Sequence, residues 1–507
     1  MMLKSKKILL LLSFVEGGCV MATELIGAKL MTPFFGTSLY VWSAVLAATL
    51  MALATGYFAG GVLSAKSDRL KNLMFIVLLA GIFMMLLPLS IKFAISLFGN
   101  FSIVIAIIAT AIMVLMPPLF MMGCVSPIII AELSAQNPNA GYVSGSIYAL
   151  STIGGILFTF LFGFYIIPNF GLKVPAFITG LFFALLPLAF FFYQKKQSVI
   201  MWFLVVFVVS GYYNFRKKTA SRVNTLYEKE GMLGKIKVAD FIPKHENDPY
   251  NGRLLLLNGI LQTYVNRSSK QSLYFDYHKA IIDIIKQQPS SNKVLVLGLG
   301  GGTLTQAIYE NGNSVEVCEI DKRMHEVALK FFDLDKNIPV NISDARQYIN
   351  QLNETFNIVI MDLFKGEEHP YHVFTVEAIK KIKKHLSDNG LIIMNIHGYL
   401  DGKTGKGNRA LLNTISYSGF HFKLFPQGDE PNNPDRRNLL LIASPDKEQL
   451  KNVANHLQSK EILFSAEKFQ NEPLLQDEFP NGDLLFAEAA RKWRTLTLSS
   501  NVVLFGE

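Results

Sequence analysis

The sequence contains the stretch Lys293-Val-Leu-Val-Leu-Gly-Leu-Gly-Gly-Gly302, an apolar run that ends in glycines. Such a run predicts a buried β-strand followed by a tight turn. Gly298, Gly300 and Gly302 would let the backbone bend sharply and approach a ligand, because glycine has no Cβ. A helix is expected directly after Gly302, and its free amide groups would face the same turn. A glycine turn can also be purely structural, so the surrounding sequence decides between the two interpretations.

The segments around this stretch alternate between strand-like and helix-like patterns. We expect strands at 294–297, 314–319, 357–361, 391–396 and 438–443, and helices at 274–288, after 302, and at 323–332, 375–386 and 446–457. This alternation is typical of a parallel, doubly wound α/β sheet. Residues 225–265 show instead short alternating runs broken by glycine and proline, which indicate β-hairpins. The sequence therefore predicts a small β-hairpin region at 219–270 and a Rossmann-like domain at 271–507.

Acidic residues follow several of the predicted strands. Glu319 ends the second strand, about 20 residues after the glycine turn, where a carboxylate binds ribose hydroxyls. Asp344 and Ala345 follow the third strand, where a carboxylate can accept a hydrogen bond from adenine, and Asp362 follows the fourth. Together with a glycine loop that has Thr303 in place of the last dinucleotide-motif glycine, these acids predict a pocket for an adenosyl nucleoside. The alternative is that each acid only caps a helix.

The N-terminal half is strongly apolar. In the whole chain 50% of residues are hydrophobic and only 17% are charged, whereas globular domains carry about 25% charged residues. A membrane span needs roughly 20 apolar residues. Segments of about that length lie at 8–31, 38–64, 73–98, 102–131, 143–168, 174–194 and 198–214. We therefore predict an α-helical multi-pass membrane domain of six to seven helices at 1–218, embedded in the lipid bilayer of the cell (inner) membrane.

The net charge of +9 is unevenly distributed. Of 48 Lys and Arg and 39 Asp and Glu, 14 and 4 respectively lie in residues 1–218, which leaves 34 and 35 in the remainder. The positive excess therefore lies beside apolar segments, where it orients helices in a bilayer. The C-terminal half is almost neutral, so we expect no nucleic-acid partner.

The basic clusters also bear on orientation. Those at 4–7, 66–71 and 195–196 fall on one side of the membrane if the N-terminus is cytoplasmic. Seven crossings would then place the C-terminal domain outside, whereas the basic residues at 216–218 favour the cytoplasm. We expect residues 198–214 to lie in the interface or to re-enter, which leaves the C-terminal domain cytoplasmic.

A few residues away from the strand ends are also candidate functional residues. Glu16 is the deepest charge in the first span, and such charges tend to mark a pathway or a ligand contact. His372 and His397 are candidate bases or simply hydrogen-bonded loop histidines. The histidines, carboxylates and three cysteines have no metal-ligand spacing, so we expect no metal.

Distributed motifs at about 225–445 resemble the spermidine synthases, or polyamine aminopropyltransferases, whose domain is class I methyltransferase-like. The matching pieces are the hairpin Leu257-Asn-Gly-Ile-Leu-Gln262, the helix start Tyr277-His-Lys279, the glycine loop Gly298–Gly302, Glu319, Asp344-Ala-Arg346 and the strand Phe356–Asp362. With the apolar N-terminal half, the whole chain resembles the fused transporter-like/spermidine synthase-like membrane proteins.

The resemblance implies roles for these positions. The co-substrate would be S-adenosylmethionine or its decarboxylated form, and an aminopropyl or related group would pass to a small amine as methylthioadenosine leaves. Asp362 would be catalytic, because it matches the acid that helps to deprotonate and position the amine. The implied co-substrate-binding residues are Gln262, Tyr277, Gly298, Gly300, Gly302, Glu319 for ribose, and Asp344 and Ala345 for adenine.

The sequence departs from the family pattern at three positions. Gly301 stands where the family has an Asp that holds the aminopropyl ammonium, Lys365 replaces the second Asp of the catalytic loop, and Lys279 replaces a glutamate. Three anionic groups are lost, which disfavours putrescine as the acceptor. The space at Gly301 also makes unmodified S-adenosylmethionine an alternative donor.

Other functions stay open at this point. The chain could be a membrane transporter or sensor whose Rossmann-like domain only binds a nucleoside or polyamine. It could also carry a degenerate domain that stabilises an assembly, and a homo-oligomer is an open alternative to a single chain.

Overall fold

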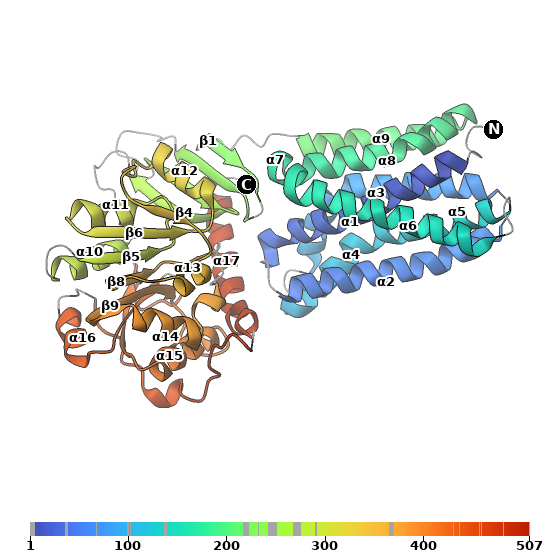
Figure 1. Ribbon diagram of the computed structural model, residues 1–507. Helices are drawn as coiled ribbons and strands as arrows, with labels where there is room; N and C mark the ends of the chain where they lie inside the picture. Colours follow the sequence, from blue (N-terminus) through green and yellow to red (C-terminus); the bar gives the residue numbers. More distant parts are fainter. Residues whose placement is uncertain are drawn as a thin grey trace. The chain divides into compact units, whose positions relative to one another are not determined.

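The computed structural model divides the protein into two compact units (Figure 1). The helical unit comprises Met1–Thr219 with Lys229–Met232, and the C-terminal unit comprises Ala220–Glu228 with Leu233–Glu507. The structure describes residues 6–35, 39–66, 68–98, 101, 103–135, 139–215, 223–231, 233–241, 251–266, 275–288, 292–364, 370–428, 430–435, 437–455, 457, 459–479 and 481–505.

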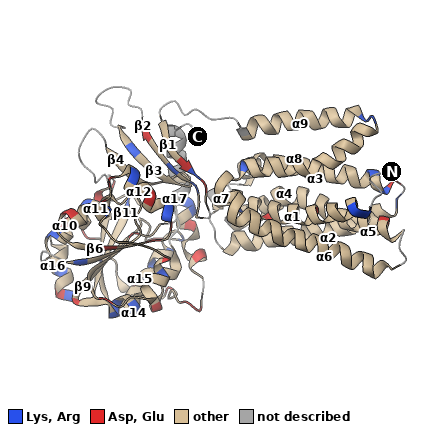
Figure 2. Ribbon diagram, turned by 45° about the horizontal axis from the view of Figure 1, so that its top comes forward, with Lys and Arg blue, Asp and Glu red and all other residues tan. Residues whose placement is uncertain are grey.

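The helical unit consists of long apolar helices. They are α1 (Lys6–Phe35), α2 (Leu39–Ser64), α3 (Arg69–Phe98), α4 (Ile103–Gly123), α5 (Val125–Ser134), α6 (Ala140–Phe160), the π-helix η2 (Leu161–Ile166), α7 (Ile167–Phe170), α8 (Lys173–Tyr193) and α9 (Gln197–Phe215). Seven helical segments are long and apolar enough to cross a membrane. Charged residues are sparse along the middles of these helices, as the colours of the ribbon in Figure 2 show. The expected multi-pass helical architecture is confirmed.

Two details differ from the expected spans. The fourth is divided at Cys124 into α4 and α5. The last, α9, is one continuous helix without an internal chain reversal, and its position in or across the membrane stays a prediction. Ser210 of α9 donates a 2.7 Å hydrogen bond to the carbonyl of Met85, so α9 packs on α3 as part of the bundle.

Glycines allow the first and fifth spans, helices α1 and α6, to meet at backbone contact. A Cβ on Gly154 of α6 would overlap the carbonyl oxygen of Phe14, and one on Gly17 of α1 would overlap that of Ser151. Small residues at the interface between membrane helices let the two backbones approach closely, which increases van der Waals contact. Beside this crossing the Glu16 side chain is buried, and it accepts hydrogen bonds from Ser151 Oγ at 3.1 Å and Ser126 Oγ at 3.5 Å.

The C-terminal unit is built on a seven-stranded sheet of order β10-β11-β9-β8-β5-β6-β7. Its strands are β5 (Lys293–Leu297), β6 (Ser314–Glu319), β7 (Val340–Ile342), β8 (Phe356–Met361), β9 (Leu386–His397), β10 (His421–Gln427) and β11 (Asn438–Ser444). The pairs from β7 to β9 are parallel, and β11 is antiparallel to both of its neighbours. This confirms the expected Rossmann-like, class I methyltransferase-like fold.

Amphipathic helices cover the sheet. They are α10 (Asp276–Lys286), α11 (Thr303–Glu310), α12 (Lys322–Phe331), α13 (Ala345–Asn350), the 3-10 helix η3 (Tyr371–Val373), α14 (Val376–Lys384), α15 (Lys406–Tyr417), α16 (Lys447–Ala454), the 3-10 helix η4 (Ala466–Lys468) and α17 (Gly482–Phe505). Their buried apolar residues and the two faces of the central strands form two large cores. Parallel strands buried on both faces read as continuous apolar runs, which is why β5 and β8 were recognisable.

A second sheet has the order β1-β2-β3-β4. Its strands are β1 (Val223–Lys229), β2 (Ile236–Phe241), β3 (Gly252–Leu257) and β4 (Ile260–Asn266). Val238 and Leu255 pack with Met324 and Val327 of α12 in one apolar cluster. The hairpins therefore lie against the Rossmann-like domain, close to the end of β6.

Candidate active site

The glycine turn after β5 has the backbone conformation that its sequence predicts. Gly298, Gly300 and Gly302 have φ values of 97°, 55° and 76°, in the region that favours glycine. A Cβ on Gly298 would overlap the carbonyl oxygen of Asp362, so the ends of β5 and β8 meet directly. Gly302 is the N-terminal boundary residue of α11 and its role in the turn is conformational.

Gly301 faces the small sheet. Its backbone N–H donates a 2.8 Å hydrogen bond to Thr263 Oγ1 of β4. A Cβ on Gly301 would lie 2.8 Å from Thr263 Cγ2, which is closer than carbon atoms normally approach. Because Thr263 is buried, a side chain at position 301 requires β4 or the turn to move.

Glu319 lies at the carboxyl end of β6 with only 8% of its surface exposed. Its Oε2 accepts a 3.0 Å hydrogen bond from the N–H of Leu299, and its Oε1 accepts one of 2.8 Å from the N–H of Asp321. Burial raises the pKa of Glu319 to about 7, although these backbone donors oppose the rise. A carboxylate has about four acceptor positions, so Glu319 keeps capacity for a ligand hydroxyl beside these backbone donors.

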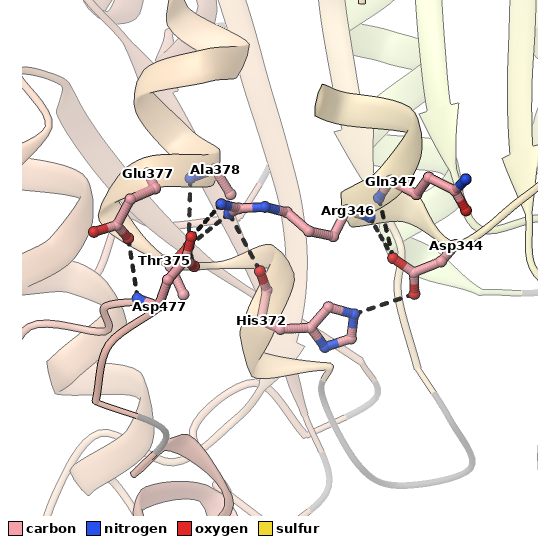
Figure 3. A network of polar contacts seen from close by, with 8 residues as sticks. All are labelled: Asp344, Arg346, Gln347, His372, Thr375, Glu377, Ala378 and Asp477. Carbon is pink, nitrogen blue, oxygen red and sulfur yellow. Dashed lines mark hydrogen bonds and ion pairs between the residues drawn. The ribbon is translucent and has the colours of Figure 1, made fainter. Parts of the chain in front are cut away.

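Asp344 combines a capping role with a position at the sheet edge (Figure 3). Its Oδ1 accepts hydrogen bonds from the backbone N–H of Arg346 at 2.8 Å and of Gln347 at 3.2 Å, which caps α13. Its Oδ2 lies 3.2 Å from Nε2 of His372. The capping alternative is therefore right for Asp344, but the second oxygen is available for other contacts. Figure 3 shows that the Arg346 side chain extends away from the Asp344 carboxylate and toward Asp477.

Asp362 is oriented by side chains from two elements, α10 and β9. Its Oδ2 accepts a 3.0 Å hydrogen bond from the Tyr277 hydroxyl of α10, and its Oδ1 accepts one of 3.0 Å from Asn395 Nδ2 of β9. Asn438 Nδ2 of β11 in turn donates to Asn395 Oδ1 at 2.8 Å. His278 Nε2 lies 3.9 Å from Asp362 Oδ2.

The tyrosine in this arrangement remains a proton donor. Burial, and after it the negative charge of Asp362, raise the pKa of Tyr277 well above its usual value. The geometry therefore holds both oxygens of Asp362 as hydrogen-bond acceptors at the carboxyl end of β8.

One cavity of about 430 Å³ connects these groups. This volume lies in the range of small-molecule sites, about 300–1,000 Å³. The predicted site residues that line it are Gln262, Tyr277, Gly298, Gly300, Glu319, Asp344, Ala345 and Asp362, whereas Gly302 is not among the lining residues. Glu319 and Asp344 thus face the same space, together with the apolar side chains of Leu299, Ile320 and Met324.

The lining of the cavity is acidic. Five carboxylates line it, and the described lining residues include neither Lys nor Arg. The five are Asp276, Glu319, Asp321, Asp344 and Asp362. Paired carboxylate and amide groups beside apolar walls can hold ribose, a flat base and a sulfonium cation. Among the described residues, no group of three or more His, Cys, Asp or Glu could hold a metal ion.

The sequence patterns missed several lining residues: Asn395, Gln427, Asn438, Phe364 and Trp493. Asn395 could have been found, because it is a polar residue inside the apolar strand at 391–396. Trp493 of α17 carries no local signal, since only the folded chain brings it to the cavity.

Of the two candidate histidine bases, His372 contacts Asp344, and His397 is buried beside Phe364 and Trp493. Lys365 lies outside the described residues.

Comparison with known proteins places these features in context. Residues 274–398 match the family described as "Spermine/spermidine synthase domain". The polyamine aminopropyltransferase of Vibrio vulnificus is 26% identical over 212 residues, which cover 40% of this chain and 68% of that protein. Polyamine aminopropyltransferase 2 of Ralstonia nicotianae is 22% identical over 430 residues, which cover 77% of this chain and 79% of that protein. That share exceeds the C-terminal unit, so the similarity extends into the helical unit.

Other matches are more partial. The N-terminal histidine N-methyltransferase of Emericella nidulans is 32% identical over 119 residues, which cover 22% of this chain and only 21% of that protein. A probable polyamine aminopropyl transferase of Bifidobacterium longum is matched over 29% of its length. Among solved structures, a probable spermidine synthase from Corynebacterium glutamicum aligns with a TM-score of 0.40 and 18% identity, covering 52% of this chain and 97% of that one.

Proposed function

Because residues 274–398 match the spermine/spermidine synthase domain, we propose that the protein is a membrane-bound aminopropyltransferase-like enzyme. Its donor is decarboxylated S-adenosylmethionine, with S-adenosylmethionine as the alternative, and its acceptor is a small amine. The observation that carries the proposal is the Asp362 carboxylate, oriented by Tyr277 and Asn395 in the same cavity as Glu319.

The donor end of the cavity lies along the ends of β5, β6 and β7. In the proposal Glu319 accepts hydrogen bonds from the ribose hydroxyls through both of its oxygens, and Asp344 Oδ2 accepts one from the adenine amino group. Leu299, Ile320 and Met324 provide the apolar walls for the base. The lining carboxylates favour a sulfonium cation over an anionic nucleotide, because a phosphate would meet repulsion from them.

The chemistry proposed for Asp362 is proton acceptance and alignment. An amine is cationic near neutral pH and must lose a proton before its lone pair can attack. Asp362 receives that proton or passes it to water, and it holds the nitrogen in line with the carbon next to sulfur. A nitrogen–carbon bond forms, the carbon–sulfur bond breaks, and the sulfur takes the electron pair as methylthioadenosine leaves.

The test is turnover by the full-length protein in lipid nanodiscs. Wild type supplied with decarboxylated S-adenosylmethionine and an amine should release methylthioadenosine, measured by mass spectrometry. Asp362→Asn keeps the shape of the side chain but removes the base, and we expect a loss of about 100-fold or more in kcat. Asp388→Asn, on the surface at the start of β9, is the matched control. Equal turnover by Asp362→Asn and wild type would contradict the proposed role.

The membrane location is part of the same proposal. Seven helices have the length and composition to cross a bilayer, and we place the C-terminal unit in the cytoplasm, where adenosyl sulfonium compounds are available. A transporter or sensor in which the domain only binds its ligand would show binding of the donor without release of methylthioadenosine.

A further inference from the structure

The cavity continues past Asp362 along the sheet edge. Asn395 of β9, Asn438 of β11 and Gln427 of β10 line this part. Asn438 is in register with His397 on one side and with Gln427 on the other. Neighbouring strands lie about 4.8 Å apart, so the three neutral amides form a row that leads away from Asp362. We call this part of the cavity the acceptor end.

Aromatic side chains form a second wall of the acceptor end. Phe364, just after β8, and Trp493 of α17 both line the cavity. The ring of His397 lies between them, 5.3 Å from Phe364 and 5.1 Å from Trp493 between centroids. His397 is only 1% exposed, so its ring is held in place by packing. The rings of Phe364 and Trp493 pack against it and present an apolar surface to the cavity.

The charges of the cavity are concentrated at its other end. Glu319, Asp321 and Asp344 follow β6 and β7, on the far side of β5 from the acceptor end. Asp276 is paired with Lys279 Nζ at 3.2 Å and Asp321 with the Arg323 guanidinium at 2.6 Å, so both of these charges are already offset. Among the described lining residues, Asp362 is therefore the last carboxylate before the row of amides.

This distribution bears on the class of acceptor. A diamine such as putrescine has two ammonium groups, and the second would lie beyond Asp362 among amides and rings, where the described lining residues provide no carboxylate to pair with it. A desolvated cation without a partner is unfavourable. An apolar chain or ring in the same place would gain from burial against Phe364 and Trp493.

We propose that the acceptor end selects a primary monoamine with an apolar body. This inference rests on the transferase function proposed above and names its acceptor class. The nitrogen of the monoamine lies at Asp362 and its body lies against Phe364 and Trp493. The amine loses one proton to Asp362 or water, its nitrogen bonds to the aminopropyl carbon, and the sulfur leaves with the electron pair. The products are a secondary amine and methylthioadenosine.

A matched pair of acceptors tests the proposal. Pentylamine has the length of putrescine with a methyl group in place of the second ammonium. With full-length protein and decarboxylated S-adenosylmethionine, kcat/KM for pentylamine should exceed that for putrescine by about tenfold or more. A kcat/KM for putrescine equal to or above that for pentylamine would overturn the inference.

Two variants test the contributions of the aromatic wall and of the row of amides to acceptor selectivity separately. Trp493→Ala should lower kcat/KM for pentylamine about tenfold, mainly through KM, and should leave KM for the donor unchanged. Tyr417→Ala, an exposed aromatic residue on α15, is the control and should change neither constant. Gln427→Glu adds a carboxylate at the acceptor end and should raise the preference for putrescine relative to pentylamine about tenfold. Unchanged selectivity in Gln427→Glu would contradict the assignment.

The outcomes distinguish this inference from the function on which it rests. Turnover with putrescine preferred over pentylamine overturns the acceptor class and leaves the transferase function intact. Donor binding without turnover of either amine overturns both. Binding of methylthioadenosine, followed as a rise in melting temperature, shows that each variant retains a folded site.

Discussion

The hydroxyl group of Tyr277 donates a 3.0 Å hydrogen bond to Oδ2 of Asp362. The two residues come from the first helix and the fourth strand of the Rossmann-like domain, and the fold brings them together at one edge of the sheet. The phenol keeps its proton because its pKa is raised well above the usual value, first by burial and then by the Asp362 charge. In this pair Tyr277 is therefore the hydrogen-bond donor and Asp362 the acceptor.

Removal of the Tyr277 hydroxyl should slow the reaction without unfolding the site. Tyr277→Phe deletes one hydrogen bond to a charged group, worth about 1.5–3 kcal/mol, so we expect kcat to fall roughly 10- to 100-fold. Asp362 keeps its contact with Asn395 and stays in place. Steady-state kinetics with varied amine measure the effect. Tyr309→Phe, on the exposed side of α11, is the control, and an equal loss in both variants would argue against the assigned role.

Glu319 should make stability depend on pH in a particular direction. Its folded-state pKa of about 7 lies above the ordinary 4.5, so the folded protein holds a proton that the unfolded chain has released between these values. This contribution to stability is complete below about pH 4.5 and is lost as the pH rises through about 7. The melting temperature of wild type minus that of Glu319→Gln should therefore be more positive at pH 5 than at pH 8.

The matched control for this prediction is Glu326, an exposed carboxylate on α12. Glu326→Gln should change the melting temperature by the same amount at both pH values, because its side chain stays in water in both states. A difference for Glu319→Gln that is constant with pH, or that grows toward pH 8, is incompatible with the buried environment described for Glu319.

Position 301 should reject an aspartate, the residue that the resemblance to the spermidine synthases would place there. The obstacle is steric, because a Cβ there would lie 2.8 Å from Thr263 Cγ2. We expect Gly301→Asp to lower the melting temperature by several degrees, as strain in a packed site costs about 1–3 kcal/mol. The double variant Gly301→Asp with Thr263→Ala removes the obstructing atoms and should recover part of the loss. A single variant as stable as wild type would show that β4 can give way.

Helix packing in the helical unit offers a matched pair of glycines on α6. A Cβ on Gly154 would overlap the Phe14 carbonyl, whereas a Cβ on Gly145 would meet nothing within 4 Å. Gly154→Ala should lower the melting temperature and the yield of monodisperse protein in detergent, and Gly145→Ala should not. Equal behaviour of the two variants would contradict the backbone contact between α1 and α6.

The fold was largely predictable because its central elements follow simple patterns. β5 and β8 are uninterrupted apolar runs, as strands buried on both faces must be, and the helices between them are amphipathic. β10 was not predicted, because His421–Gln427 mixes charged, aromatic and proline residues and is fixed by its pairing with β11. The long α17 was also missed, although it contributes Trp493 to the cavity.

The candidate site was predictable on the donor side and poorly predictable on the acceptor side. Glu319 and Asp344 follow strands at positions that the sheet topology brings to one edge. Asn395, by contrast, reads as part of an apolar strand, and its bond to Asp362 depends on β8 and β9 being neighbours. The acceptor end is assembled from segments far apart in sequence, so no local pattern marks it.

The central claim is that the cavity between the glycine turn, Glu319 and Asp362 receives an adenosyl sulfonium compound. Isothermal titration of methylthioadenosine into the full-length protein at pH 8 tests it most directly, with Glu319→Gln in the same nanodiscs. We expect saturable binding of one molecule per chain in wild type and an affinity at least about tenfold lower in Glu319→Gln, because the ribose hydroxyls lose a charged acceptor. Absence of binding in wild type, or the same affinity in both proteins, would contradict the account.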